Sequence, residues 1–441
     1  MAQVKTLDTA FPDQHASLAI GAVAIVDGPA PDDELLKDLL AQRLPSIPRC
    51  TQVLRTQDFE WMDCPGLDFA HHVRRVAVRR PGDDAELSRA IAHALERPLD
   101  LDRPLWECWV IEGLRGNRWA ILMKVHHWLA DGHSAAHLLT RLCDDAERDT
   151  FANHAGPKGI SPTQDDKRGW VDALGRAAGL ADSLVGAIWP AARPAVGAVT
   201  TMRKYGTVRV PRADVDRVCR KFGVTVNDVA LAAITEGFRT MLLGRGEQPR
   251  ADSLRTLVPM PMRSAMLPYL PVEHEDPVQL LRAVHDLWKA QKAEHTDEPG
   301  LVESALNMLP TMLRSNVIQL LARLPQRATV TLATNAPGPR HQLRLMGRTL
   351  ERFLPIPPTA VRLSTGVGVL SYGDEVVFGI TGEYDAAADV KRLAAGIELG
   401  VARLVALSQD SVLLFSKDRR RRSKARAFPN RSLRAHPSSL R

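Results

Sequence analysis

The stretch MKVHHWLADGHSAAHLL, residues 123–139, gathers residue types that can move protons. The adjacent His126 and His127 are followed, after three residues, by Asp131 and Gly132. An imidazole with a pKa of about 6.5 is largely neutral near pH 7 and can take a proton from a hydroxyl group. A lone histidine is more often a structural residue, but the four fixed positions of H-H-x-x-x-D-G rarely arise by chance. We therefore take this stretch as the candidate catalytic site.

Two predicted elements hold this stretch in place. The apolar residues 118–127 predict a strand, and the residues after the Asp-Gly pair predict a helix. Because successive side chains of a strand point to opposite faces, His126 and His127 face opposite sides and do different jobs. Alternation by itself leaves open which of them faces a cleft. Asp131 precedes the helix, where unpaired N–H groups favour a carboxylate, and Gly132 permits a tight turn.

Strand and helix patterns alternate on both sides of a polar linker, which predicts an α/β protein with two similar halves. Within the linker, the amphipathic pattern of 170–189 predicts a helix that bridges the halves or lies on a lipid surface. A cleft between the halves is the natural place for a ligand. The predicted boundaries are 1–150 for the first half, 151–204 for the linker and its helix, 205–415 for the second half and 416–441 for a tail.

The composition is that of an ordinary globular protein, with 45% hydrophobic and 25% charged residues. The five cysteines form no C-x-x-C pair, so we expect neither a disulfide framework nor a zinc site. The N-terminal stretch has no signal-peptide pattern, and no apolar run is long enough to span a bilayer. We therefore expect a cytoplasmic protein that meets membranes only at their surface.

The basic character of the chain lies in its tail. Residues 416–441 hold ten Lys/Arg and one Asp, a net charge of +9, whereas the whole chain carries +7 and residues 1–415 therefore −2. Blocks of like charge repel and extend, so we expect a solvated, disordered end. The alternative is an electrostatic tether to anionic lipid or nucleic acid.

The residues around the histidine pair resemble a known family. HHWLADG is similar to the H-H-x-x-x-D-G motif of coenzyme-A-dependent acyltransferases and peptide condensation domains. Further segments resemble the bacterial wax ester synthase/diacylglycerol acyltransferase family, in order over nearly the whole chain. They are RPLDLDRPLWECWVIEGL at 97–114, VTVNDVALAA at 224–233, RTLVPMPMR at 255–263, TNAPGP at 334–339 and GVGVLSYGDEVVFGIT at 366–381.

This resemblance implies a fold and a mechanism. It implies two chloramphenicol-acetyltransferase-like halves, with a tunnel at their interface that acyl-CoA and alcohol enter from opposite sides. His127 would be the general base, while His126, Asp131 and Gly132 would support it. The reaction would need no metal and no resident cofactor, because acyl-CoA is a co-substrate. The chain contains no G-x-S-x-G, H-E-x-x-H or P-loop motif.

Asn227 and Asp228 match a second family motif. Their local sequence has an equally good structural explanation, since Thr225 and Asp228 have the spacing of a capping box at the start of a helix. We favour a scaffold role over catalysis for this pair.

Three further positions are candidates for the cleft or for the crossover between the halves. Arg263 follows a predicted strand end, and Asn335 and Gly338 lie in the TNAPGP segment. After RTLVPMPMR the family usually has a Gly-Asn loop, whereas here SAMLPYLPVEHEDP follows at once. This apparent deletion near the tunnel mouth predicts an altered substrate range or activity.

The function we expect is acyl-CoA-dependent O-acyl transfer. The acceptor would be diacylglycerol, giving triacylglycerol, or a long-chain alcohol, giving wax ester. Two alternatives remain open: transfer to another hydroxylated lipid or a carrier-bound acceptor, and a catalytically silent paralogue that binds acyl-CoA or lipid. A membrane or lipid-inclusion surface is an expected partner, and nucleic acid is not. The sequence sets no oligomeric state.

Overall fold

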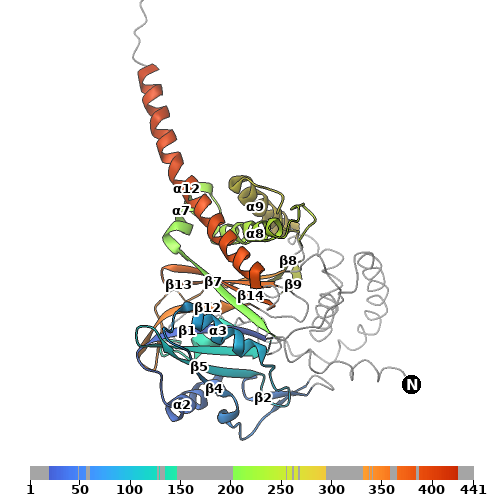
Figure 1. Ribbon diagram of the computed structural model, residues 1–441, viewed down its shortest axis with the longest axis vertical. Helices are drawn as coiled ribbons and strands as arrows, with labels where there is room; N and C mark the ends of the chain where they lie inside the picture. Colours follow the sequence, from blue (N-terminus) through green and yellow to red (C-terminus); the bar gives the residue numbers. More distant parts are fainter. Residues whose placement is uncertain are drawn as a thin grey trace, which may run out of the picture.

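The computed structural model contains two α/β halves and a long C-terminal helix (Figure 1). Each half is built on a six-stranded sheet. The described residues are 19–47, 49–55, 60–126, 129, 135–146, 202–254, 256–260, 263–266, 269–294, 331–336, 338–339, 341–357, 365–383 and 387–425. The predicted linker helix at 170–189 lies outside them.

The first sheet has the strand order β11-β12-β1-β6-β5-β4. Its neighbouring strands are antiparallel except β4 and β5, which run parallel. Gly116 and Asn117 turn the chain between β5 and β6 with φ of 84° and 55°, a conformation that suits these two residue types. The strands are β1 (Ala19–Asp27), β4 (Val73–Ala77), β5 (Trp106–Leu114), β6 (Arg118–His126), β11 (Arg344–Leu345) and β12 (Arg348–Ile356).

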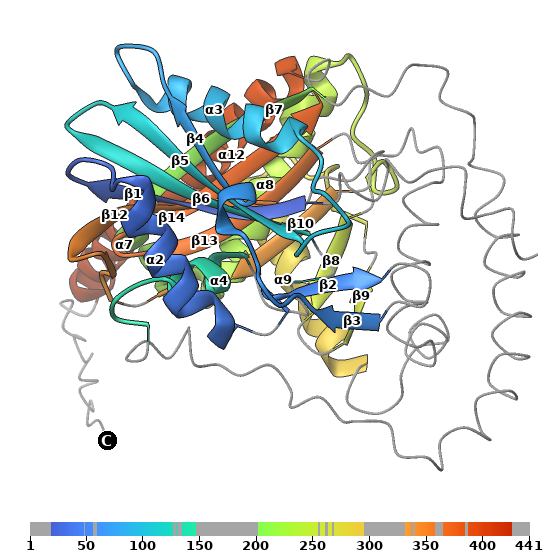
Figure 2. The same ribbon diagram turned by 90° about the horizontal axis from the view of Figure 1, so that it is seen from below.

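Helices cover both faces of the first sheet (Figure 2). Residues of α2 and α4 share a core cluster with Met123 and Val125 of β6, whereas residues of α3 cluster with Leu122. Asp32 and Asp83 cap α2 and α3, each accepting an N–H of the first helical turn. The helices are α2 (Asp33–Arg43), η1 (Leu44–Ser46), η2 (Phe69–His71), α3 (Asp84–Glu96) and α4 (Ala135–Arg141), and a small hairpin pairs β2 (Gln52–Arg55) with β3 (Glu60–Asp63).

The second sheet has the order β7-β14-β13-β10-β8-β9. One of its faces packs against α7, α8, α9 and α12, and the opposite face meets the first half. The strands are β7 (Arg203–Pro211), β8 (Thr256–Met260), β9 (Arg263–Met266), β10 (Thr331–Ala336), β13 (Thr365–Tyr372) and β14 (Glu375–Glu383). The helices are α7 (Arg212–Phe222), α8 (Val226–Gly244), α9 (Pro277–Glu294) and α12 (Ala387–Ala425).

The sequence-based boundaries are wrong for one segment. They assign the whole of 205–415 to the second half, but β11 and β12 belong to the first sheet, where β12 pairs with β1. Strand β1 is almost wholly buried and has β6 on its other edge, so its free edge needs a hydrogen-bonding partner. The distant β12 supplies it, which makes the first half discontinuous in sequence.

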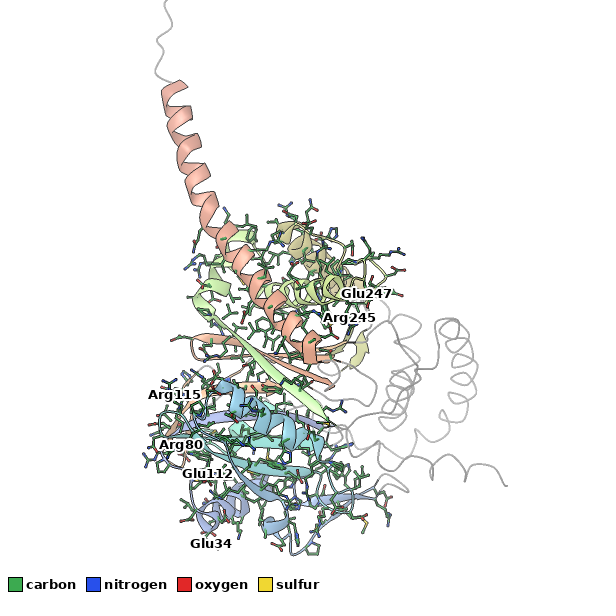
Figure 3. The ribbon with its side chains drawn as sticks, in the orientation of Figure 1. Glu34, Arg80, Glu112, Arg115, Arg245 and Glu247 are labelled. Atoms are coloured by element: carbon green, nitrogen blue, oxygen red, sulfur yellow. The ribbon has the colours of Figure 1, made fainter. Side chains whose placement is uncertain are left out.

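The tail also differs from its prediction. We expected disorder from residue 416, but α12 continues as one helix of 39 residues to Ala425. Lys, Arg and Ala are good helix formers, and cations near a helix C-terminus interact favourably with its dipole. At the other end of α12, the Asp389 carboxylate accepts a hydrogen bond of 2.7 Å from Arg245 at the end of α8. Figure 3 shows Arg245 beside Glu247 there.

The two halves pack closely where β12 meets β14. The Tyr205 hydroxyl of β7 donates a hydrogen bond of 2.9 Å to the Pro355 carbonyl of β12, and burial raises the pKa of this tyrosine so that it keeps its proton. A Cβ added to Gly379 of β14 would lie 1.9 Å from the same carbonyl oxygen. Only glycine therefore allows this approach of the two backbones.

Candidate active site

The histidine motif begins where β6 ends. His126 is the last residue of β6, is fully buried, and pairs with Ala19 of β1. Its N–H donates to the Leu105 carbonyl at 2.9 Å, and its own carbonyl accepts from the Leu129 N–H at 3.0 Å. The start of the motif is thus held by β1, by the residue before β5 and by the loop that follows.

Three motif residues, His127, Asp131 and Gly132, lie outside the described residues, and their predicted roles stay predictions. The elements on both sides are described and well packed. Val125 before the motif, Leu129 within it and Leu139 of α4 belong to one buried cluster. The motif is therefore fastened at both ends to the core of the first half.

The predicted alternation along β6 is confirmed for the described residues. Ile121, Met123 and Val125 belong to one cluster, and Leu122 belongs to the cluster on the opposite face.

A buried ion pair that the sequence analysis did not single out lies next to the motif. Lys124 of β6 is fully buried and stands directly opposite Glu107 of β5 in the register. Its Nζ lies 3.4 Å from the Glu107 carboxylate, which also accepts the Trp109 indole N–H at 3.0 Å. Burial lowers the pKa of Lys124, and the Glu107 carboxylate opposes that shift. The signal was present in the sequence as a single charge within the apolar run AILMKVHH.

Lys124 also binds the C-terminal end of α3. Its ammonium group donates to the carbonyl of Ala94 at 2.9 Å and to the carbonyl of Arg97. Carbonyls at the end of a helix lack partners within the helix, so a buried cation there satisfies them. In the same turn of α3, the Glu96 carboxylate accepts the N–H of Arg203, where β7 begins. The strand that carries the motif is thereby linked through α3 to the start of the second half.

The second motif pair lies at the start of α8. The predicted capping box is confirmed: Thr225 Oγ1 accepts the Asp228 N–H, and the Asp228 carboxylate accepts the Thr225 N–H at 2.9 Å. The same carboxylate oxygen lies 3.0 Å from His285 Nδ1 of α9. Burial raises the pKa of Asp228, but hydrogen bonds from Thr225 and His285 outweigh this and leave the pKa below its usual value. Asn227, beside it, is half-buried.

Comparison with known proteins covers both halves of the chain. Residues 7–194 match the wax ester synthase/diacylglycerol acyltransferase catalytic domain, and residues 263–404 match the C-terminal domain of the same family. A putative diacylglycerol O-acyltransferase of Mycobacterium tuberculosis is 59% identical, covering 99% of this chain and 98% of the relative. The chain belongs to the wax ester synthase/diacylglycerol acyltransferase family.

More distant relatives share the same architecture. A probable diacylglycerol O-acyltransferase of Mycobacterium tuberculosis is 44% identical, covering 93% of this chain and 97% of the relative. The wax ester synthase/diacylglycerol acyltransferase from Marinobacter aquaeolei VT8 has a TM-score of 0.63 at 23% identity, covering 89% of this chain and 95% of that one. The first condensation domain of the calcium-dependent antibiotic synthetase has a TM-score of 0.57 at 15% identity, with coverage of 89% and 92%. These two structures confirm the two-half α/β fold.

The remaining candidate positions of this family member lie in the second half. Arg263 is the first residue of β9 and pairs with Met260 of β8. Asn335 lies on β10 opposite Val369 of β13. The side chains of Arg263 and Asn335 are outside the described part.

Gly338 has a clear steric role. A Cβ at this position would lie 1.8 Å from the Ser371 carbonyl oxygen of β13, a distance that no side chain tolerates. The glycine therefore lets the segment after β10 pass directly over the backbone of β13. This is a scaffold role at the crossover.

Among the described residues, no group of three or more His, Cys, Asp and Glu side chains could hold a metal ion. All five cysteines are free thiols. Within the same part of the chain, no helix combines the length and the apolar character needed to cross a membrane.

Proposed function

We propose that this acyltransferase esterifies diacylglycerol to triacylglycerol or a long-chain alcohol to wax ester, using acyl-CoA. The observation that carries the proposal is the intact HHWLADG between the end of β6 and the start of α4, in a chain of this family. The buried anchoring of both flanking elements supports it, because a general base must be held within hydrogen-bond reach of its proton.

In the proposed reaction, the His127 imidazole takes the proton of the acceptor hydroxyl. The oxygen attacks the thioester carbonyl of acyl-CoA, the new ester C–O bond forms, and the C–S bond breaks. The imidazolium returns its proton to the departing thiolate, so the enzyme ends as it began and free coenzyme A leaves. Neither a covalent acyl-enzyme nor a resident cofactor enters this scheme.

His126, Asp131 and Gly132 would position the base. Because the alcohol and acyl-CoA must reach one imidazole together, we propose a tunnel between the halves with two entrances. We also propose a cytoplasmic enzyme that works at the surface of a membrane or lipid inclusion, since its acceptor and product are lipids.

The test is ester formation from labelled oleoyl-CoA with a panel of acceptors: diacylglycerol, a long-chain alcohol, a sterol and a carrier-bound acyl acceptor. His127→Ala is expected to lower turnover by about a thousandfold, the usual contribution of a general base. The matched control is His71→Ala, because His71 is exposed and lies outside the motif. A purified His127→Ala protein that stays fully active would overturn the mechanism.

One observation favours a second candidate function. After Arg263 the chain continues directly with SAMLPYLPVEHEDP, where the family usually has a Gly-Asn loop, and this predicts a different acceptor or a protein that binds without turnover. In the same panel, turnover confined to the sterol or carrier-bound acceptor would support the former. Acyl-CoA binding with no product from any acceptor would support the silent paralogue.

A further inference from the structure

Helix α12 is anchored in the fold at one end and leaves it at the other. Its first part packs against α8 through residues at three-to-four spacing, and the last described buried position is Ser408. Figure 1 shows the second part of the helix extending beyond the rest of the described fold. At about 1.5 Å per residue, the stretch from Ser408 to Ala425 reaches roughly 25 Å. The buried apolar residues are Val390, Leu393, Ile397, Val401 and Leu404.

The extended part of α12 carries two kinds of residue in succession. Four apolar residues, Val412 to Phe415, come first. The ten residues 416–425 follow, with six Lys/Arg and one Asp, and the next residue in sequence is again an arginine. Residues 1–415 carry a net charge of −2, so the positive charge is concentrated on this extension and the residues after it.

This combination fits an anionic lipid surface. Lys and Arg near such a surface are attracted to acidic headgroups, and neighbouring apolar side chains gain by entering the boundary between headgroups and acyl chains. Nucleic acid would attract the cations but offers the apolar residues no comparable environment. Because the proposed acceptor and product of this enzyme are lipids, a lipid surface also suits the proposed function. The choice of lipid as the partner rests on that proposed function.

We propose that residues 412–425 of α12 dock this enzyme onto bilayers that contain anionic phospholipid. The continuous helix transmits the attachment to the second half, because α12 packs along α8 before it leaves the fold. The docked body would then be held close to a membrane in which diacylglycerol is dissolved. Salt weakens this attachment, since screening shortens the reach of the charges to about 10 Å at 0.1 M ionic strength.

Vesicle flotation tests the proposal on the full chain. The His127→Ala protein is included with the wild type, so that loss of esterification and loss of docking are measured separately. We expect both to float with vesicles of phosphatidylglycerol and phosphatidylcholine, and neither with phosphatidylcholine alone. Raised salt should release them.

The decisive variant neutralises Arg419, Arg420, Arg421 and Arg422 to Gln together. We expect its partition onto anionic vesicles to fall at least about a hundredfold. The matched control changes four exposed arginines of the body to Gln, of which Arg80 and Arg115 are seen in Figure 3 on the first half, away from α12. The four control positions are Arg79, Arg80, Arg115 and Arg220.

Several outcomes would overturn the proposal. They are unchanged flotation of the quadruple variant, an equal loss in the control variant, equal binding to neutral vesicles or triacylglycerol droplets, and tighter binding to duplex DNA than to anionic vesicles. Leu413→Ser with Leu414→Ser is the second variant, and it should bind more weakly at raised salt, where the apolar contribution remains. None of these measurements needs catalysis.

Discussion

At the scale of single residues, the most informative side chain is Lys124. It carries its charge in a fully buried position, opposite Glu107 and against the last carbonyls of α3. Burying a charge is costly unless it is paired and hydrogen-bonded, and here the ammonium group donates to two backbone carbonyls and to the Glu107 carboxylate. Such a residue holds the end of β6, and with it His126, in a single arrangement. We regard it as a positioning residue for the motif.

Lys124→Met is therefore expected to destabilise the fold and to lower turnover. Removing the ammonium group leaves the buried Glu107 carboxylate with only Arg97 at 3.6 Å and Arg74 at 3.9 Å, and we expect a cost of about 3 kcal/mol in the free energy of unfolding, the lower end for a broken buried pair. Urea unfolding gives the stability, and steady-state kinetics on the variant that remains folded should show a lower kcat at a nearly unchanged KM.

The matched control is Lys37→Met, because Lys37 is a half-buried lysine at the surface of α2 whose partner Glu34 lies on the same helix. Its unfolding midpoint should not move. In the double variant Lys124→Met with Glu107→Leu, an apolar pair replaces the ionic one, and part of the stability should return. A Lys124→Met protein as stable and as active as the wild type would contradict the positioning role.

At the scale of elements, the capping box of α8 connects a family motif to helix stability. Asp228 holds the first turn of α8 through Thr225 and reaches α9 through His285. Since its Oδ2 atom is engaged by Thr225 and His285 together, a scaffold role accounts for the residue without substrate contact.

Asp228→Asn should lower the free energy of unfolding by about 1 kcal/mol near neutral pH, the typical effect of a lost cap. Because the folded-state pKa of Asp228 is depressed, its stabilising contribution is complete above the ordinary carboxyl pKa of 3.8 and is lost as the pH falls through the folded-state pKa. The difference in the free energy of unfolding between wild type and variant should therefore shrink only in strong acid.

Urea unfolding over a pH series measures this difference. Asp252→Asn is the control, since Asp252 is exposed in the loop after α8. A difference that stays constant down to the lowest pH would contradict the role assigned to the Asp228 carboxylate.

At the scale of the whole molecule, the halves meet through backbone as well as side chains. Gly379 of β14 lies against the Pro355 carbonyl of β12, and Tyr205 donates its hydroxyl proton to that oxygen. Because β12 belongs to the first sheet and β14 to the second, this contact fixes the distance between the two halves.

Gly379→Ala is expected to force the backbones apart and to cost about 2 kcal/mol, as overpacking does. Thermal unfolding should show a lower midpoint, and turnover should fall because the proposed tunnel lies between the halves. Gly206→Ala on the neighbouring strand β7 is the control, since its added Cβ would meet only Val390 at 3.4 Å. Equal effects of the two substitutions would contradict this account of the interface.

Much of the local structure follows from local sequence. The spacing of Thr225 and Asp228 predicted the cap of α8, and the alternation of 118–127 predicted the buried strand and the opposite faces of its residues. These features depend on hydrogen bonds and packing between residues close in the chain, so a short window contains the information.

Only the tertiary structure decided the long-range partners. No local pattern distinguishes β12 from a strand of the second sheet, because its apolar residues fit either one, and the free edge of β1 determines the choice. The partners of Lys124 come from α3 and β5, and the steric need for Gly379 comes from a carbonyl of the other half. The sequence by itself determined the elements, the motif and the concentration of charge near the C-terminus. The tertiary structure decided which strand edges and sheet faces remained to be covered by distant elements, because this depends on how all the elements pack together.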